Sequence, residues 1–443
     1  MSAGAPDFTA LGAEMHALAT ELFPLPRSLT GPAYRATLDA LEGVSGPLRR
    51  HRFATGERVL DWEIPREWTI RDAWVKGPDG AVVVALSDSS LHVVSYSVPV
   101  HRRLSLDELQ GHLHSLPDRP TAIPYRTSYY QEQWGFCLAD EVRRALAPGE
   151  YEVRIDADLE PGEVELGELV VEGSGEGEVL FWTYCCHPSM ANNELSGPVL
   201  VSQLARLMRE RGEPPRHTYR FVFGPETIGS LAYLARFGER LRERLVAGYV
   251  VTCAGDPAPF TYKRSRRGRS LADRAAEHVL AHTQPVARVL DFVPAGSDER
   301  QFCSPGFDLP VGSLMRTMYA TNPEYHTSLD DLSFVTADAL GESLAAYWRV
   351  VETLEANETL TGTVLHGEPQ LSRRGLYPTT GGGQDAHAQR GLQDMLQLLS
   401  RCDGSADLLA VATATDRPIW ELRAVADRLR EHDLLRAADH AVD

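Results

Sequence analysis

The segment between residues 184 and 197 carries the side chains of this chain that are best suited to chemistry. His187 follows an apolar run, 179–182, with the character of a buried strand, and an amphipathic run typical of a helix begins at Gly197. Reactive groups of α/β proteins collect outside the carboxyl ends of strands. The pattern predicts a hydrolytic site in which His187 is a zinc ligand through neutral imidazole. The alternative is a buried histidine that bonds to a backbone carbonyl.

The polar residues at the N-terminus of the predicted helix have two interpretations. Asn192, Asn193 and Glu194 precede the helix directly. In one interpretation they face the reactive histidine. In the other, the asparagines cap the helix and Glu194 is a first-turn acid that interacts with the helix dipole.

Two later clusters repeat the arrangement of a strand followed by polar residues. Glu226 lies between a predicted strand and a predicted helix, where it would be a metal ligand, a general base or only a first-turn acid. His326 follows another strand and loop, and Asp330 or Asp331 would either orient a ligand or cap the turn. A charged segment, 296–300, ends a further strand and is either part of the site or solvated surface.

Composition narrows the classes of function. The chain has 443 residues, a formal net charge of -18 and a pI near 5.3. This acidity disfavours binding to nucleic acid or to an anionic membrane, because both need clustered lysine and arginine. The six cysteines form no CxxC pair, the N-terminus lacks a signal-peptide pattern, and no apolar run approaches the length of a membrane span. We therefore expect a cytoplasmic protein.

Strands and helices alternate between about residues 150 and 360, which predicts an α/β fold with a mixed, mostly parallel sheet and helices on both faces. Short strands separated by turn residues precede this region, and three helical patterns follow it. The predicted domains are an α/β domain at 1–50 and 126–365, a small β-rich inserted domain at 51–125 and a winged-helix-like domain at 366–443. A helix is predicted over 129–146, and a linker over 369–383.

Three blocks of the sequence resemble a known family. They begin at Cys186-His187, at Pro225-Glu226 and at Ser297-Asp298, and the last extends to Tyr325-His326. The chain is similar to the zinc aminopeptidase family that includes bacterial leucyl aminopeptidases and glutaminyl-cyclase-like proteins. It looks most like a bacterial aminopeptidase-like branch that has a β-rich insertion and a C-terminal winged helix.

The resemblance implies roles for matching positions. His187 and His326 match zinc-binding histidines, and Glu226 matches one of two adjacent glutamates, a general base and a ligand. Asn193, which is predicted as a metal residue with the two histidines, stands where the family has an aspartate that bridges two metals, and Cys253 stands near the position of a later aspartate ligand. Two dications about 3.5–4 Å apart need anionic ligands, so a single zinc is expected. It would use His187 and His326, or one of them with Glu226, Glu194 or Cys253.

The predicted function is a zinc-dependent amide hydrolase of aminopeptidase type. Glu226 would be the general base, and Glu194, Asp298 and Glu299 would hold the free α-amine of a short peptide or an amino-acid conjugate. Two rivals stay open: a transferase or cyclase on the same fold, and a binding or regulatory protein with an inactive core. The sequence leaves open whether the protein forms a homo-oligomer.

Overall fold

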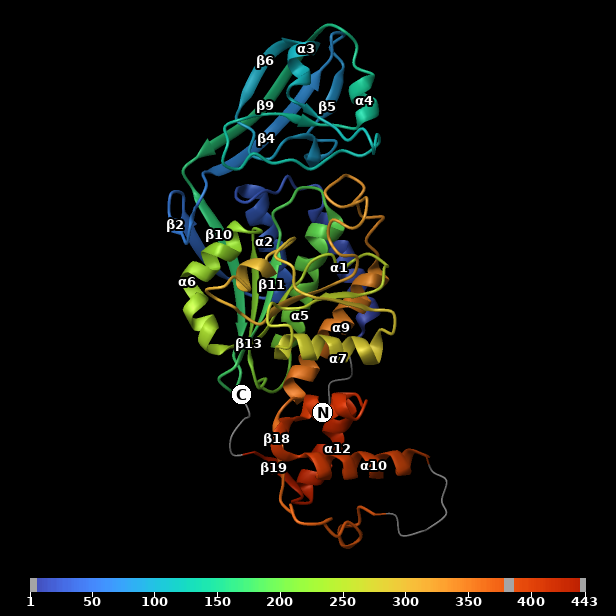
Figure 1. The fold of residues 1–443 in the computed structure, drawn as a ribbon. Coiled ribbons are helices and arrows are strands. Elements are labelled where there is room, and N and C mark those ends of the chain that lie inside the picture. The colour runs from blue at the N-terminus through green and yellow to red at the C-terminus, as the bar shows by residue number, and fades with distance from the viewer. Residues whose placement is uncertain (1–5, 378–385, 439–443) are drawn as a thin grey trace. The chain divides into compact units, whose positions relative to one another are not determined.

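The computed structural model describes residues 6–377 and 386–438. The chain forms two compact units, Met1–Asp273 with Val286–Ala345 and Arg274–Pro285 with Ala346–Asp443. The first unit holds an α/β core and a β-rich insertion, and the second holds C-terminal helices and strands (Figure 1). No helix within the described ranges is long and apolar enough to cross a membrane.

An eight-stranded mixed sheet forms the centre of the first unit. In order across the sheet, its strands are β1 (Arg49–Ala54), β10 (Glu163–Val171), β12 (Thr218–Gly224), β11 (Glu178–Tyr184), β13 (Leu245–Val250), β16 (Val311–Met315), β14 (Thr261–Lys263) and β15 (Arg288–Leu290). The four strands β12, β11, β13 and β16 are parallel to one another. Antiparallel pairs join β1 to β10, β10 to β12 and β16 to β14. The carboxyl ends of the four parallel strands therefore lie at one edge.

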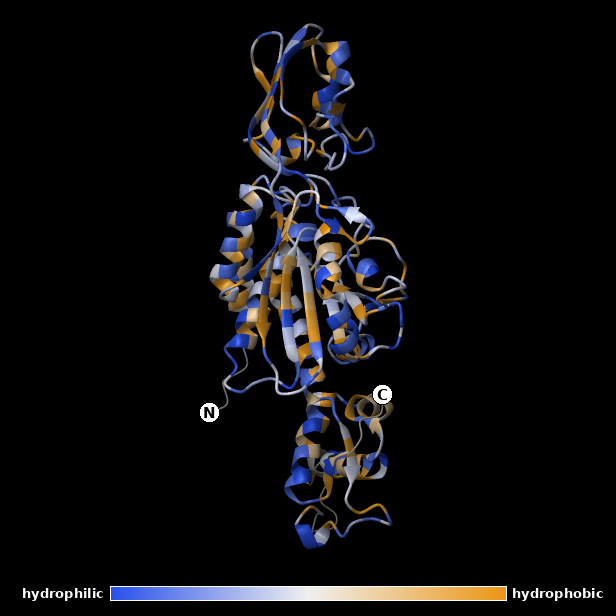
Figure 2. Ribbon diagram, turned by 90° about the vertical axis from the view of Figure 1, so that its left-hand side faces the viewer, coloured by the Kyte–Doolittle hydropathy of each residue, from blue (hydrophilic) through white to orange (hydrophobic). Residues whose placement is uncertain are grey.

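Helices cover both faces of this sheet, so its central strands are buried and apolar (Figure 2). On one face, α5 (Ser196–Arg209) packs against β10, β11 and β12, beside α1 (Phe8–Leu22) and α2 (Pro32–Ser45). On the other face, α6 (Ile228–Arg244) packs against β10 and β13 and contacts α8 (Glu299–Phe302). Two further helices, α7 (Leu271–Thr283) and α9 (Ala337–Ala356), begin in the first unit and continue in the second. These observations confirm the predicted fold class.

A cluster of buried charged side chains around Glu168 connects strands β1, β10 and β12 with helix α6. Glu168 of β10 accepts hydrogen bonds from His51 of β1 at 2.8 Å, from Arg220 of β12 at 2.7 Å and from Tyr233 of α6 at 2.7 Å. Burial alone would raise the pKa of Glu168, but these partners outweigh it and lower the pKa to about 2. The carboxylate therefore stabilises the fold in its charged form.

The pH dependence of stability follows from that lowered pKa. The contribution of Glu168, about 3 kcal/mol, is present above the pKa of about 4.5 that glutamate has when unfolded. It is lost as the pH falls towards 2. We expect Glu168→Gln to lower Tm clearly at pH 7, and the gap between wild type and variant to narrow from pH 5 to pH 2. Thermal unfolding between pH 5 and pH 2 measures this difference in Tm. A difference that stays constant over the range would contradict the prediction.

The β-rich insertion is built on a four-stranded antiparallel sheet. Its strands are, in order, β5 (Val82–Ala85), β4 (Glu67–Lys76), β9 (Glu150–Glu160) and β6 (Val100–Ser105). Smaller elements are β2 (Arg58–Val59), β3 (Trp62–Glu63), η1 (Ser90–His92), α3 (Leu106–Gln110), β7 (Leu113–His114), β8 (Phe136–Cys137) and α4 (Asp140–Arg144). Because β9 pairs with both β4 and β6, this sheet extends beyond the predicted limits of 51–125.

The helix predicted over 129–146 is wrong for most of that span, since only α4 is helical there. Tertiary contacts explain the difference. The Trp134 ring stacks on His112 with centroids 3.6 Å apart, and Phe136 pairs with Leu113 in a short parallel ladder. Packing against residues more than 20 positions away therefore holds Trp134 and Phe136 in a non-helical segment.

The C-terminal part of the second unit has three helices and an antiparallel sheet, as the prediction of a winged helix requires. Its elements are β17 (Thr359–Gly362), η3 (Ser372–Arg374), α10 (Ala386–Arg401), β18 (Asp403–Asp407), α11 (Leu408–Ala414), α12 (Ile419–Glu431) and β19 (Leu435–Ala437). Strand β17 pairs with β18 and β19, so the sheet begins before residue 366, the predicted boundary. Residues 378–383 of the predicted linker lie outside the described ranges.

Candidate active site

Two neighbouring parallel strands bring His187 and Glu226 together. Strands β11 and β12 end in register, with Tyr184 opposite Gly224, so the residues after them are adjacent. The backbone N–H of Glu226 donates to Cys186 Sγ at 3.2 Å, and His187 Nε2 lies 3.5 Å from Glu226 Oε2. The strand ends therefore fix this histidine and this carboxylate as a pair.

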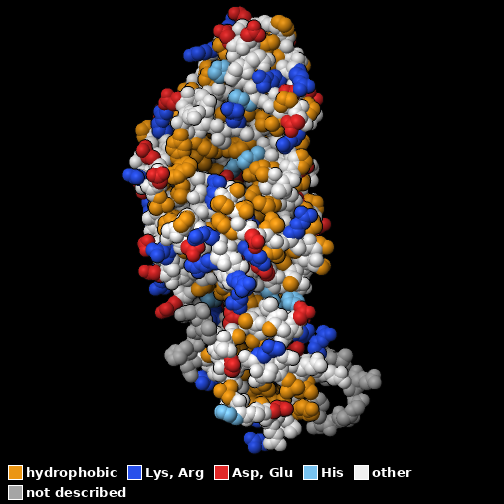
Figure 3. All heavy atoms as spheres, in the orientation of Figure 1, with side chains coloured by type: hydrophobic (Ala, Val, Ile, Leu, Met, Phe, Trp, Pro, Cys, Tyr) orange, Lys and Arg blue, Asp and Glu red, His pale blue; other side chains and the backbone are white. Residues whose placement is uncertain are grey.

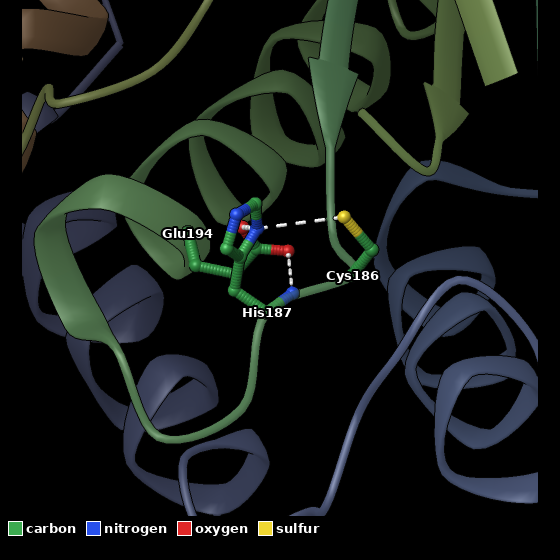
Figure 4. Close-up of side chains that lie close together, drawn as sticks. All are labelled: Cys186, His187 and Glu194. Carbon is green, nitrogen blue, oxygen red and sulfur yellow. Dashed lines mark hydrogen bonds and ion pairs between the residues drawn. The ribbon is translucent and has the colours of Figure 1, made fainter. Parts of the chain in front are cut away.

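Glu194 orients the His187 ring. Its Oε2 lies 2.5 Å from His187 Nδ1, and its Oε1 accepts the backbone N–H of His187 at 2.7 Å (Figure 4). Glu194 is fully buried in the π-helical turn η2 (Ala191–Leu195) that leads into α5, and such turns are frequent at functional sites. A histidine held at Nδ1 by a carboxylate presents Nε2 as a ligand, which is the usual support of a metal-binding histidine.

We expect Glu194→Gln to weaken zinc binding about 10–100-fold, because the amide no longer holds His187 with a charge. The affinity is measured by titration against a chromophoric chelator, with thermal unfolding to check the fold. The matched control is Glu210→Gln, which changes an exposed acid at the end of α5. Equal zinc affinity in the two variants would show that Glu194 serves only the helix turn.

His326 reaches the same place from the loop after β16. Its ring centroid lies 5.4 Å from that of His187, and its ring stacks on Tyr325 with centroids 3.9 Å apart. The backbone N–H of Tyr125 donates to the His326 carbonyl at 2.9 Å. Within the part of the chain that the structure describes, the buried His326 Nε2 has no hydrogen-bond partner. A buried ring nitrogen without a partner is available to a metal.

Asp330 joins the loop of His326 to the turn of Glu194. Its carboxylate accepts the backbone N–H groups of Asn192 and Asn193 at 2.6 and 2.9 Å. Burial raises the pKa of Asp330 to about 7 against the effect of these bonds. Asp330 therefore positions backbone in this site, which corresponds to the capping alternative rather than direct contact with a ligand.

The ionisation states of His326 and Glu226 suit a cation that lies beside both side chains. Burial, with the charge of His187, lowers the pKa of His326 to about 3 and keeps its ring neutral. Burial raises the pKa of Glu226 to about 8, because the opposing charge of His187 is weaker and Asp298 and Glu194 add to the effect. A positive ion beside Glu226 would restore the carboxylate form.

Four of the ten described non-glycine residues with positive φ are predicted site residues or lie within two positions of one. Ser189, Thr227, Cys253 and His326 have φ values of 37°, 62°, 49° and 56°. Residues other than glycine in this region cost free energy and persist where the surrounding structure holds them, commonly at functional sites. Each of the four lies in the loop after one of the parallel strands, as expected for loops shaped to aim side chains.

A pocket of about 540 Å³ opens over the pair. Cys186, His187, Glu226 and His326 line it together with Leu29, Trp62, Tyr125, Thr127, Tyr129, Tyr130, Thr227, Ile228, Arg300 and Gln301. Figure 3 shows hydrophobic side chains around a hollow that has histidine beside it. The pocket has room for an amino-acid side chain and its neighbouring amide.

Other predicted site residues have different surroundings. Glu194, Asp298 and Glu299 do not line this pocket. Asp298 accepts hydrogen bonds from Trp182, the backbone of Thr227 and Ser230 at 2.7 to 2.8 Å, which caps α6. Glu299 is fully buried and accepts from Lys263 at 2.5 Å and from Tyr319 at 2.7 Å. The geometry therefore does not favour α-amine binding by these acids.

Asn193 lies beneath the site, where its amide nitrogen donates to Tyr184 at 3.1 Å and lies 3.9 Å from Cys253 Sγ. Its buried Oδ1 has no hydrogen-bond partner within the described residues. Burial raises the pKa of Cys253 to about 12, which favours the neutral thiol. A neutral amide and a neutral thiol supply little negative charge, so these donors fit one zinc better than two.

The donors present fit one zinc ion. His187 Nε2 and His326 Nε2 are donors of the type that hold a catalytic zinc, and Glu226 Oε2 lies 3.5 Å from His187 Nε2. Among the described residues, Cys186, His187 and Glu194 are the group whose ligand atoms all lie within 4.8 Å of one another, and the set with His326 and Glu226 is more widely spaced. Within the group that includes Cys186, Glu194 pairs with His187 Nδ1. The other ring nitrogen, His187 Nε2, stays available on the side of Glu226 and His326. The set with His326 and Glu226 also opens to the pocket.

Two residues of the site escape prediction from the sequence. The Tyr125 ring lies 4.8 Å from His187 and 5.3 Å from His326, although the residue falls at the end of the predicted insertion. Its neighbours Tyr129 and Tyr130, which also line the pocket, make this an aromatic-rich loop, and that is the available signal. Arg300 was the one basic residue in the charged segment 296–300.

The fold is shared with known zinc aminopeptidases. A zinc aminopeptidase from Bacillus subtilis matches with a TM-score of 0.56 at 13% identity, over 77% of this chain and 95% of that chain. A peptidase M28 precursor from Shewanella amazonensis matches with a TM-score of 0.53 at 12% identity, over 78% and 95% of the two chains. At these identities the likeness concerns the fold.

More similar proteins cover the whole chain. A relative from Clostridium acetobutylicum, provisionally named a polysaccharide biosynthesis protein with aminopeptidase-like domain, is 41% identical over 96% of both sequences. A crystal structure from the same organism, provisionally described as a peptidase, matches with a TM-score of 0.91 at 39% identity, over 98% of each chain.

Family profiles match both parts of the chain. The family described as "Domain of unknown function (DUF4910)" matches residues 16–357, and a winged helix-turn-helix family matches residues 358–437. The chain therefore belongs to the DUF4910 family, with a core of the zinc-aminopeptidase fold and a C-terminal winged helix.

Proposed function

We propose that this protein is a zinc-dependent amide hydrolase of aminopeptidase type. The observation that carries the proposal is the convergence of His187, Glu226 and His326 on one pocket. The likeness of the fold to zinc aminopeptidases supports it. The proposed substrate is a short peptide or an amino-acid conjugate, because the pocket holds about 540 Å³.

The proposed biological setting is a bacterial biosynthetic pathway. The name of the 41% identical relative, which refers to polysaccharide biosynthesis, supports this setting. A cytoplasmic location belongs to the same proposal. The six cysteines, all within the described ranges, are free thiols, which suits a reducing compartment.

The chain's own residues have distinct roles in the proposed reaction. His187 and His326 hold the zinc, and Glu194 fixes the His187 ring. A bound zinc lowers the pKa of a water molecule towards about 7 and polarises a carbonyl. Glu226 accepts a proton from the attacking water and returns it to the leaving amine. Its position in the pocket wall, 3.5 Å from His187, supports this role.

A second candidate is a transferase, or a binding protein with an inactive core. Asn193 favours it, because the aspartate that bridges two metals in the resembled family is here an amide. Pro225 stands where that family has a second glutamate beside Glu226. Glu226 must then do the work that two adjacent glutamates share in that family.

We propose that nucleic acid is not the partner of the winged helix. In α12, Arg423 bonds to Glu358 at 2.8 Å and Arg430 bonds to it at 2.6 Å. Arg417, just before that helix, bonds to Asp394 at 2.9 Å. Arginines held by acids within the same unit are poorly placed to neutralise phosphates. Self-association is the alternative use of this domain, and sedimentation analysis would detect it.

Metal removal tests the proposed function. The purified protein should contain about one zinc per chain, and it should release the amine from aminoacyl-amide substrates. A chelator should abolish the release, and added zinc should restore it. Zinc without hydrolysis of any amide would favour the transferase or binding protein. Hydrolysis that persists without zinc would refute the proposal.

A further inference from the structure

The charges that line the pocket are few and of opposite sign. Among the described residues that line it, Arg300 is the one arginine or lysine and Glu226 is the one carboxylate. If Glu226 is used in the reaction, no lining carboxylate is left for a substrate cation. Arg300, by contrast, has no role in the proposed chemistry.

Arg300 has hydrogen-bonding capacity to spare. A guanidinium has five N–H donors. Within the described residues, Arg300 has one hydrogen bond, from Nη2 to Thr227 Oγ1 at 3.3 Å, and no ion pair. Arg220 shows the contrast, because two buried glutamates hold its guanidinium. The contact with Thr227 also places Arg300 beside the residue that follows Glu226.

The acids next to Arg300 in the sequence do not neutralise it. Asp298 bonds to groups of β11 and α6, and Glu299 is paired with Lys263 in the core. The positive charge of Arg300 therefore acts on the pocket, where it also lowers the pKa of Glu226. A charge of this kind at a partly buried site attracts an anion, and a guanidinium matches a carboxylate or a phosphate with two parallel hydrogen bonds.

Apolar side chains line other parts of the pocket. They include Leu29, Ile228 and several aromatic rings. At its rim, Trp62 and Tyr130 are 42% and 54% exposed, and their rings meet edge to face with centroids 5.9 Å apart. Exposed aromatic rings beside a charged pocket favour a ligand with an apolar or aromatic group next to its anionic group.

We propose that Arg300 binds an anionic group of the substrate, a carboxylate or a phosphate, while the aromatic rim holds an adjoining apolar group. This inference rests on the proposed function and gives it a substrate class. The amide that is cleaved then belongs to a molecule with an acid function.

Binding of two matched probes tests the role of Arg300. The probes are N-acetyl-L-phenylalanine, which has a carboxylate, and its carboxamide, which does not. Titration calorimetry of the full-length protein should give at least tenfold tighter binding for the acid. Arg300→Gln should lower the affinity for the acid roughly 10–100-fold and leave the amide unchanged. Arg266→Gln, an exposed arginine paired with Asp308, is the control and should behave as wild type.

The outcomes separate this inference from the proposed function. Zinc content is measured in every variant, and Arg300→Gln should keep its zinc. Equal affinity of the wild type for acid and amide, or an acid preference that survives Arg300→Gln, would overturn the inference. If the preference for the acid survives Arg300→Gln but is lost in zinc-free His187→Ala, the metal and not Arg300 binds the carboxylate of the probe. Tighter competition by inorganic phosphate than by the acid would identify a phosphate as the natural group at Arg300.

Discussion

Replacing Glu226 by glutamine is expected to lower turnover about 10²–10⁴-fold, with the fold intact and most of the zinc retained. The amide keeps the shape of the side chain, and it accepts no proton at neutral pH. Glu226 lies 3.5 Å from His187 and lines the pocket, so no other described carboxylate of the pocket lining replaces it. Steady-state kinetics and zinc analysis of the same preparation measure both effects.

The control for this prediction is Glu239→Gln, which changes an exposed glutamate on α6, the helix that follows Glu226. It should behave as wild type. Loss of zinc together with turnover in Glu226→Gln would make Glu226 a ligand more than a base. Full turnover with full zinc would leave it as a helix-terminal acid, whose charge is worth about 0.3–1 kcal/mol.

Loss of either histidine is expected to remove most of the bound zinc and to reduce hydrolysis to background. His187 and His326 are the two proposed zinc ligands of this chain, and a single remaining histidine holds zinc weakly. The fold should persist, because the sheet and its helices are formed without the loops that carry these side chains. Zinc content by mass spectrometry and far-ultraviolet circular dichroism of His187→Ala and His326→Ala test this.

His366→Ala is the matched control, since His366 is exposed in the second unit. It should keep its zinc. Unchanged zinc in both site variants would refute the assignment of the ligands. Unfolding of both variants would instead indicate a structural metal.

The sequence predicted the elements that position the site, because each has a clear local pattern. The strand and the helix that the sequence predicts on either side of His187 are β11 and α5, and those on either side of Glu226 are β12 and α6. The polar residues that follow such strands must then lie at one edge of a parallel sheet. For this reason His187, Glu226 and His326 were identifiable before their contacts were known.

The roles of the neighbouring acids were harder to predict, because they depend on contacts across the fold. Glu194 and Asp298 look alike in sequence as acids near a helix start. One holds the His187 ring and the other caps α6 through Thr227 and Ser230. Glu299 accepts a hydrogen bond from Lys263 of β14, which lies 36 residues earlier in the chain. Tyr125 and Arg300 join the pocket by the same kind of long-range packing, which no local pattern encodes.

The position of the metal tests the central claim most directly. Crystals of the zinc-loaded protein should give one anomalous difference peak at the zinc absorption edge, within about 2.0–2.2 Å of His187 Nε2 and His326 Nε2, on the side of the pocket that Glu226 lines. The peak should be absent below the edge. A peak on the Nδ1 side of His187, between Cys186 and Glu194, or no peak near His187, would contradict the account.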